Sequence, residues 1–263
     1  MFVARNHKGL LCNALEDKIE KGADFVCPAC SGAVRFKKGK VMQPHFAHIS
    51  LEECRFYREN ESAEHLNLKA ELFRWAVQTE EVEVEAFLPA LQQIADLLVD
   101  KKLALEVQCS PLSIERLQER TLSYRQHGYQ VLWLLGQKLW LKDSLTRLQK
   151  DFLYFSKNMG FHLWELDQEK QVLRLKYLIH EDLHGKVQHK IKNFPFAHGR
   201  LLDILRLPFP YHNERFPCRR RNINIDARKH HSVNSGQHST RERLCKGNID
   251  IVGTHITIIS TGI

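Results

Sequence analysis

The 263-residue chain has no apolar run of about 20 residues, the length that a membrane-spanning helix needs. Its 43% hydrophobic and 27% charged residues are ordinary for a globular protein, so collagen, a coiled coil and wholesale disorder are excluded. The net charge of +8 favours polyanionic partners, but nine Lys and Arg against four Asp and Glu place most of it in residues 211–263. Seven cysteines, with no signal peptide ahead of them, predict a reducing, cytoplasmic setting.

Residues 1–58 consist of short segments broken by Gly and Pro, and they predict a module that a metal ion helps to fold. Cys27 and Cys30 form one half of a tetrahedral site, and His45 and His48 follow at a distance that suits the other half. Cys54 is an alternative fourth ligand in place of one histidine. Four protein ligands leave no open position for a substrate, so the expected zinc would be structural.

Basic side chains surround this predicted zinc site. Lys37 and Lys38 lie in the sequence between Phe36 and Phe46, and lysines interleaved with aromatic rings suit single-stranded DNA. A solvated basic face is the alternative interpretation.

Residues 59–143 predict one α/β unit. Apolar residues at helical spacing indicate a helix from Glu61 to about Gln78, with Asn60 or Ser62 as its cap. A three-stranded meander follows, with strands at Val82–Phe87, Ile94–Val99 and Leu103–Cys109. A helix from Ser113 to His127, stopped by Gly128, and an apolar strand, Tyr129–Leu135, then indicate a right-handed crossover.

The remaining residues divide into a third region, 144–209, and a tail, 210–263. The third region predicts a helix at 144–157, a hairpin of Phe161–Leu166 and Gln171–Ile179, and a short helix at Gly199–Leu207. The tail has neither helical nor strand periodicity. It is either a basic arm for nucleic acid or a disordered or out-of-frame terminus, and we draw no function from it.

Residues His180–His184 match the HExxH string of zinc peptidases. That chemistry needs a helix, so that both imidazoles share one face. The preceding residues favour a strand and Gly185 follows at once, so the sequence predicts a polar turn here.

Three acidic residues form a second candidate site, after the predicted zinc site. If residues 100–102 are the loop of the meander, Asp96 lies directly across from Glu106, with Cβ atoms about 5 Å apart, and Gln108 shares the face of Glu106. Glu64 shares the buried face of its helix and adds a third carboxylate. Like charges repel unless a cation joins them, and hard oxygen ligands select Mg²⁺ or Mn²⁺. Solvated strand carboxylates are the alternative.

At these residues the sequence resembles the PD-(D/E)xK nuclease superfamily and, more closely, the competence protein CoiA family, from about residue 1 to 209. The matching features are Cys27-x-x-Cys30, His45-Phe46-Ala47-His48, Glu64-His65 with Lys69, Ala95-Asp96-Leu97-Leu98, Leu105-Glu106-Val107-Gln108-Cys109-Ser110, and Glu119-Arg120-Thr121-x-x-Tyr124 before Val131-Leu132-Trp133. The resemblance implies a restriction-endonuclease-like α/β core behind an N-terminal zinc-ribbon-like module. It also implies action on DNA in natural transformation, where the family promotes recombination of incoming donor DNA.

The resemblance also implies roles for individual residues. Glu64, Asp96 and Glu106 would hold the metal, Mg²⁺ or Mn²⁺, for phosphodiester hydrolysis, and Gln108 stands where the superfamily more often has lysine. An amide there only orients a hydrogen bond, so the rival hypothesis is a non-catalytic DNA-binding recombination-accessory factor.

Two residues of the following helix are candidates for substrate contact. Arg120 and Tyr124, one turn apart, would touch phosphate and nucleobase of single-stranded donor DNA or recombination intermediates. A surface ion pair and a core aromatic are the alternative interpretations. Recombination proteins are the further partners that we expect.

Overall fold

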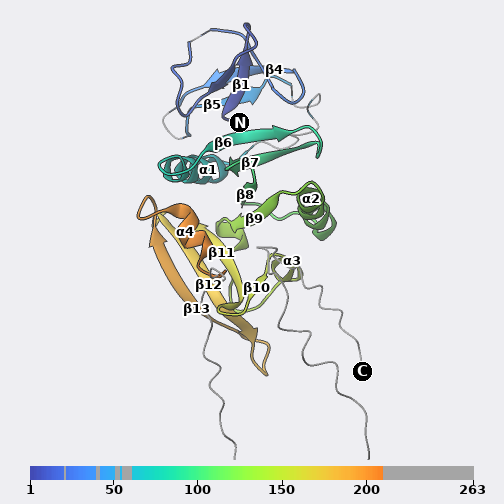
Figure 1. Ribbon diagram of the computed structural model, residues 1–263, viewed down its shortest axis with the longest axis vertical. Helices are drawn as coiled ribbons and strands as arrows, with labels where there is room; N and C mark the ends of the chain where they lie inside the picture. The colour runs from blue at the N-terminus through green and yellow to red at the C-terminus, as the bar shows by residue number, and fades with distance from the viewer. Residues whose placement is uncertain (21, 40–41, 51–53, 55–60, 210–263) are drawn as a thin grey trace, which may run out of the picture.

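The structure is a computed structural model that describes residues 1–20, 22–39, 42–50, 54 and 61–209. The predicted tail, 210–263, lies outside the described residues. The described chain forms two sheets, a small N-terminal one and a large mixed one flanked by helices (Figure 1). No helix in these described ranges is long and apolar enough to cross a membrane.

The N-terminal sheet is antiparallel and has the strand order β2-β1-β3-β4-β5. Its strands are β1 (Val3–Asn6), β2 (Leu11–Asn13), β3 (Phe25–Val26), β4 (Ala33–Lys37) and β5 (His45–His48). Phe46 of β5 is fully buried, with its ring centroid 4.9 Å from that of Phe25 and 5.4 Å from that of Phe36. This aromatic core is small, and a sheet of this size gains from a metal ion.

The large sheet has the order β13-β12-β11-β9-β8-β7-β6, with β10 beside β11. The pairs β8–β9 and β9–β11 are parallel and the others are antiparallel, so the fold class is mixed α/β. The elements are α1 (Ala63–Ala76), β6 (Val82–Leu88), β7 (Gln93–Val99), β8 (Leu103–Gln108), α2 (Ile114–Gln126), β9 (Gln130–Leu135), the 3₁₀ helix η1 (Gln137–Leu139), α3 (Arg147–Asp151), β10 (Tyr154–Ser156), β11 (Gly160–Asp167), β12 (Val172–Glu181), β13 (Val187–Pro195) and α4 (Leu201–Arg206).

The predicted helix–meander–crossover arrangement is confirmed. Ser62 caps α1 by accepting a hydrogen bond from the His65 amide at 3.1 Å, and Ser113 caps α2 in the same way. Gly128 ends α2 with a φ of +80°, which a residue with a Cβ atom adopts at a cost. The strand β9 then returns parallel to β8, as a crossover requires.

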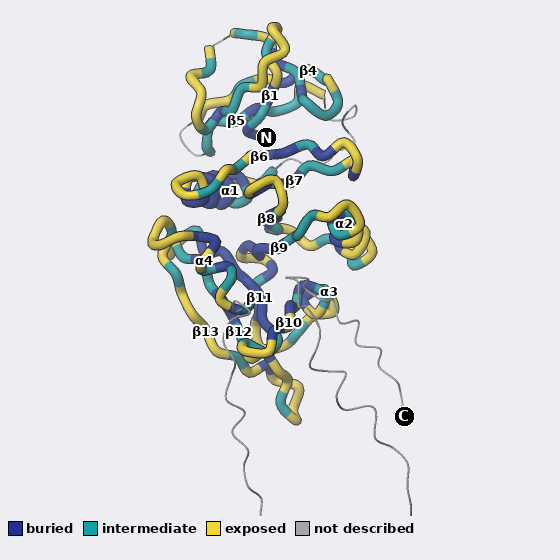
Figure 2. The backbone as a smooth tube through the Cα atoms, in the orientation of Figure 1, coloured by how far each residue is buried: buried dark blue, intermediate teal, exposed yellow. Residues whose placement is uncertain are grey.

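The helices α1 and α2 lie on either side of the central strands (Figure 1). Leu97 and Leu105 belong to the main core together with the apolar face of α1, whereas Leu98 and Ala104 pack with Tyr124 of α2. Alternate residues of one strand face opposite sides of a sheet, so this division follows from the strand period. Covering both faces buries the central strands, as Figure 2 shows for β7, β8 and β9.

The third region departs from the prediction in two places. The helix expected at 144–157 is wrong for its second half: α3 ends at Asp151, and β10 follows and pairs with β11. A tertiary contact decides this, because the Trp133 amide donates a hydrogen bond to the Tyr154 hydroxyl oxygen at 2.8 Å. The strand β13 was not expected, because its side chains are mostly exposed and polar, as an edge strand requires.

The hairpin β11–β12 and the short helix α4 confirm the remaining predictions for this region. Because β11 pairs with β9, one sheet runs across residue 143, where we had expected a new region to begin. The domain boundaries at 58, 143 and 209 stay predictions.

Candidate functional site

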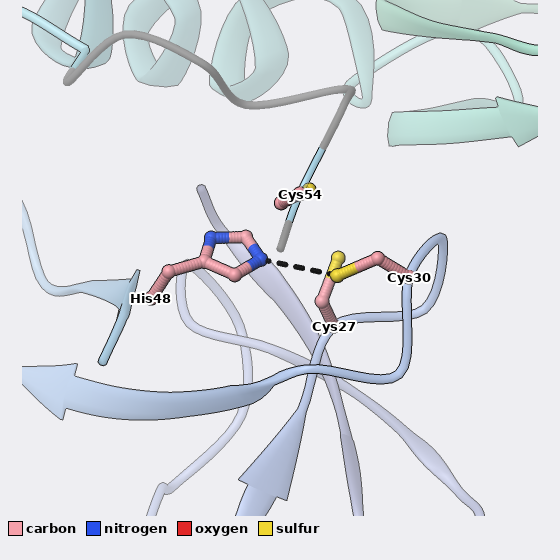
Figure 3. Close-up of side chains that lie close together, drawn as sticks. All are labelled: Cys27, Cys30, His48 and Cys54. Carbon is pink, nitrogen blue, oxygen red and sulfur yellow. Dashed lines mark hydrogen bonds between the residues drawn. The ribbon is translucent and has the colours of Figure 1, made fainter. Parts of the chain in front are cut away.

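The N-terminal sheet brings together four soft metal ligands. One ligand atom from each of Cys27, Cys30, His48 and Cys54 lies within 4.8 Å of the others. The His48 Nε2 atom is 3.5 Å from the Cys30 sulfur (Figure 3). Three sulfurs and one imidazole nitrogen at these separations suit a closed tetrahedral zinc site.

Local backbone geometry positions the first two cysteines. A tight turn joins β3 to β4, in which the Ser31 amide donates to the Cys27 carbonyl oxygen at 2.9 Å. The Gly32 amide donates to the Cys30 sulfur at 3.3 Å. Burial raises the pKa of Cys27 to about 12, so a metal ion would have to displace the thiol proton. Burial lowers the pKa of His48, which keeps its imidazole neutral and fit to bind metal.

His45 is not part of this group of ligands. Its Nδ1 atom lies 2.8 Å from the Gln43 carbonyl oxygen. The sequence left open whether a second histidine or Cys54 is the fourth ligand. In this structure the fourth member of the ligand group is Cys54. Lys37 and Lys38 are exposed near the far end of β4, where phosphate can reach them.

The acidic site lies at the carboxyl end of β8. The predicted register is confirmed from Val99, which faces Leu103, to Leu97, which faces Leu105, whereas the expected pair Asp96–Glu106 is not among the register pairs of β7 and β8. The Asp96 Oδ2 atom accepts hydrogen bonds from the Val107 amide at 2.9 Å and pairs with His65 Nε2 at 3.1 Å. Burial by itself would raise the pKa of Asp96, but the positive charges of His65 and Lys69 lower it to about 2.

Glu106 is held by two side chains of α2. Its Oε1 atom accepts from the Arg120 guanidinium at 2.8 Å and from the Tyr124 hydroxyl at 2.5 Å. Burial raises the pKa of Glu106 to about 7, against the opposing effect of Arg120 and with a further upward contribution from Asp96. A carboxyl with such a pKa is poised to exchange a proton for a cation near neutral pH.

Arg120 and Tyr124 thus both donate hydrogen bonds to the Glu106 carboxylate in this structure. Tyr124 is fully buried, so its ring has no exposed face for a nucleobase, and this departs from the contact that we expected. The Arg120 side chain is 21% exposed and its guanidinium lies 5.2 Å from the Trp133 ring centroid. The accessible part of Arg120 is at the edge of the acidic site.

Glu64 and Gln108 flank the two central acids. The Glu64 Oε1 atom accepts from the Gln137 amide at 2.7 Å, which ties α1 to the end of β9. A Cβ atom added to Gly136 would stand 2.9 Å from that oxygen, so only glycine leaves room for this contact. Gln108 donates through its Nε2 atom to the Ser110 carbonyl oxygen at 2.6 Å, which leaves its own amide oxygen available as an acceptor.

Among the described residues, the carboxylate oxygens of Glu64, Asp96 and Glu106 do not all lie within 4.8 Å of one another. Asp96 instead forms such a group with Glu61 and His65. The sequence interpretation missed Glu61, and it gave no role to His65 or to the fully buried Lys69. Their signal was present, since Glu61, His65 and Lys69 recur every four residues in the segment that the sequence predicts as a helix, although α1 itself begins after Glu61. Asp96 raises the pKa of His65 to about 9 against the effect of burial, so His65 is positively charged at neutral pH.

The HExxH string is not a metal site in this structure. His180 and Glu181 end β12, and the following residues form a turn in which Asp182 accepts from the His184 and Lys186 amides at 2.9 Å. The two histidines therefore lack the common helical face that a zinc peptidase needs, and the predicted polar turn is confirmed.

Both parts of the chain match models of known protein families. Residues 61–206 match the family model described as "Competence protein CoiA, nuclease-like domain", and residues 12–57 match "Competence protein CoiA, N-terminal domain". Competence protein CoiA of Bacillus subtilis (strain 168) is 32% identical over 159 residues, which cover 59% of this chain and 40% of that protein. The chain thus spans less than half the length of this curated relative. No solved structure matches.

Proposed function

Because the chain belongs to the competence protein CoiA family, we propose that it cleaves phosphodiester bonds of DNA, with a divalent cation, during natural transformation. One observation carries this proposal: Asp96 of β7 and Glu106 of β8 lie on adjoining strands, close enough for the charge of Asp96 to raise the pKa of Glu106, and their pKa values are displaced in opposite directions. Such pairs of perturbed acids are common at functional sites. We further propose that α1, the β6–β8 meander, α2 and β9 form a restriction-endonuclease-like core.

The residues present have the chemistry that Mg²⁺ or Mn²⁺ requires. Asp96 and Glu106 would supply hard oxygen ligands, and Glu64 lies near Cys109, just past the end of β8. A divalent cation held there would polarise the phosphate and acidify a bound water. Arg120 orients Glu106 and presents its exposed portion to a phosphate oxygen. Gln108 can accept a hydrogen bond from the attacking water through its amide oxygen.

We assign the N-terminal group of ligands to structural zinc, in a zinc-ribbon-like module. Its four donors are all protein atoms, which leaves no open coordination position. Lys37 and Lys38 on this module would bind the phosphates of single-stranded donor DNA or of recombination intermediates. Cys12, Cys27, Cys30 and Cys109 form no disulfide in the described ranges, which supports a reducing, cytoplasmic setting shared with recombination proteins.

A non-catalytic DNA-binding accessory factor is the second candidate. Gln108 favours it, because the position that commonly carries lysine holds an amide that is bonded to Ser110. Without a cation from the protein beside the attacking water, cleavage would be slow while metal and DNA binding remained.

The deciding experiment incubates the purified chain with labelled single- and double-stranded DNA, with Mg²⁺, with Mn²⁺ and with chelator. Asp96→Asn should abolish the products without weakening DNA binding, because removing a negative charge reduces the repulsion of phosphate. Asp167→Asn is the matched control: Asp167 is also an ion-paired strand carboxylate, buried and 2.5 Å from Arg174, but it lies at the end of β11. Metal-independent products, or DNA binding without products, would reject the nuclease.

A further inference from the structure

Glu85 is a buried acid in the middle of β6 with an unusual backbone. Its φ is +52°, a conformation that residues with a Cβ atom rarely adopt inside a strand. The register between β6 and β7 pairs Val84 with Leu97 and Ala86 with Ala95, and it omits the pair between them, Glu85 and Asp96. The two acids therefore lie opposite each other where the ladder is interrupted.

The interruption changes which way the side chains face. Val84 and Leu97 belong to the main core, whereas Ala86 and Ala95, two residues along each strand, belong to the second cluster. In a regular strand, residues two apart share a face. The local distortion is therefore what directs Glu85 and Asp96 towards α1. Backbone strain of this kind persists where surrounding contacts hold it, and it concentrates at functional sites.

The contacts of Glu85 join two parts of the molecule. Its Oε2 atom accepts from the amides of Phe2 at 2.6 Å and Val3 at 3.0 Å, which anchors the start of β1. Its Oε1 atom accepts from Lys69 Nζ at 2.7 Å. The same ammonium group lies 3.6 Å from Asp96 Oδ1. A continuous chain of charged contacts thus runs from the N-terminal sheet to Asp96.

We infer that Glu85 is a positioning residue for the acidic site: it keeps the Lys69 ammonium group closer to itself, at 2.7 Å, than to Asp96, at 3.6 Å, and couples the docking of the N-terminal module to metal binding. This rests on the proposed function, since it assumes that Asp96 is a metal ligand. Lys69 is fully buried and divides its ammonium group among Glu61, Glu85 and Asp96. Without the charge of Glu85, Lys69 moves towards Asp96 and competes with the cation for its carboxylate.

The test measures Mn²⁺ affinity of the zinc-loaded full chain, from the electron paramagnetic resonance signal of free Mn²⁺. Glu85→Gln removes the charge and keeps the shape, and it should weaken Mn²⁺ binding about tenfold, the scale known for groups that support metal ligands. The matched control is Glu165→Gln. Glu165 is also buried, accepts a backbone hydrogen bond, from Leu141 at 2.7 Å, and pairs with Lys176 at 3.1 Å, but it lies on β11.

The outcomes separate the inference from the proposed function. Weaker Mn²⁺ binding in Glu85→Gln, with Glu165→Gln within about twofold of wild type, supports the positioning role. Equal affinities for wild type and Glu85→Gln, or equal losses in both variants, would overturn it and leave the metal site standing. Absence of Mn²⁺ binding in the wild type would overturn both. If Glu85→Gln does not fold, Mn²⁺ binding is measured on Glu85→Asp instead. This variant keeps the charge but is one methylene too short to reach both Lys69 and the amides, so weaker Mn²⁺ binding supports the inference and unchanged binding overturns it.

Discussion

Glu106 should make the protein less stable as the pH rises from about 4.5 to about 7. Its pKa is about 7 in the folded chain, against an ordinary value of 4.5, mainly because burial disfavours the carboxylate. The folded chain therefore binds this proton more tightly than the unfolded chain does. The resulting stabilisation is fully present below pH 4.5 and is lost as the pH rises through 7. The shift corresponds to about 3 kcal/mol.

Glu106→Gln isolates this contribution. Glutamine has nearly the shape of the protonated acid but does not titrate, so the substitution removes the pH-dependent part alone. The attraction between ionised Glu106 and Arg120 is already contained in the folded-state pKa of Glu106, and the guanidinium stays charged throughout, so Arg120 adds no separate pH dependence. His65, with a pKa of about 9, and Asp96, with a pKa of about 2, titrate in both proteins and largely cancel in the difference.

The assay is urea unfolding of wild type and Glu106→Gln, loaded with zinc but free of Mg²⁺ and Mn²⁺, from pH 4.5 to 8. All four tryptophans lie between residues 61 and 206, so their fluorescence reports the unfolding of the large sheet. The variant should gain about 3 kcal/mol relative to wild type between pH 4.5 and 7.5. Parallel stability curves for the two proteins would refute the raised pKa of Glu106.

Two further substitutions test other parts of the account. Cys54→Ser should reduce bound zinc from one ion per chain to much less, as metal analysis would show, whereas Cys12→Ser, a cysteine outside the ligand group, should leave the zinc content unchanged. Gly136→Ala should destabilise the chain by about 1–3 kcal/mol in urea unfolding, because the new Cβ atom would lie 2.7 Å from the Cys109 sulfur and 2.9 Å from Glu64 Oε1; unchanged stability would show that this corner is loosely packed.

Local patterns in the sequence were sufficient for the elements that build the acidic site. The caps Ser62 and Ser113 lie where a hydroxyl precedes a helical pattern, and the short loop at 100–102 fixed the register between β7 and β8. The apolar strand β9 was recognisable because it is buried on both faces. These features depend on residues close together in the chain.

The remaining features depend on contacts between distant residues. The choice of Cys54 over His45 is made by the fold of the N-terminal sheet, since both spacings suit zinc. The buried position of Tyr124 follows from which face of α2 meets the sheet, and the one-turn spacing to Arg120 left that open. The strained backbone of Glu85 breaks the strand period that the sequence interpretation assumed, so its link to Lys69 was not predictable.

The most direct test of the account is an anomalous difference map from crystals of the chain soaked in Mn²⁺. The account predicts one peak about 2.1 Å from carboxylate oxygens of Asp96 and Glu106, separate from a zinc peak among Cys27, Cys30, His48 and Cys54. A Mn²⁺ peak held by Glu61 and His65 without Glu106, or no Mn²⁺ peak at a concentration that supports DNA cleavage, would contradict it.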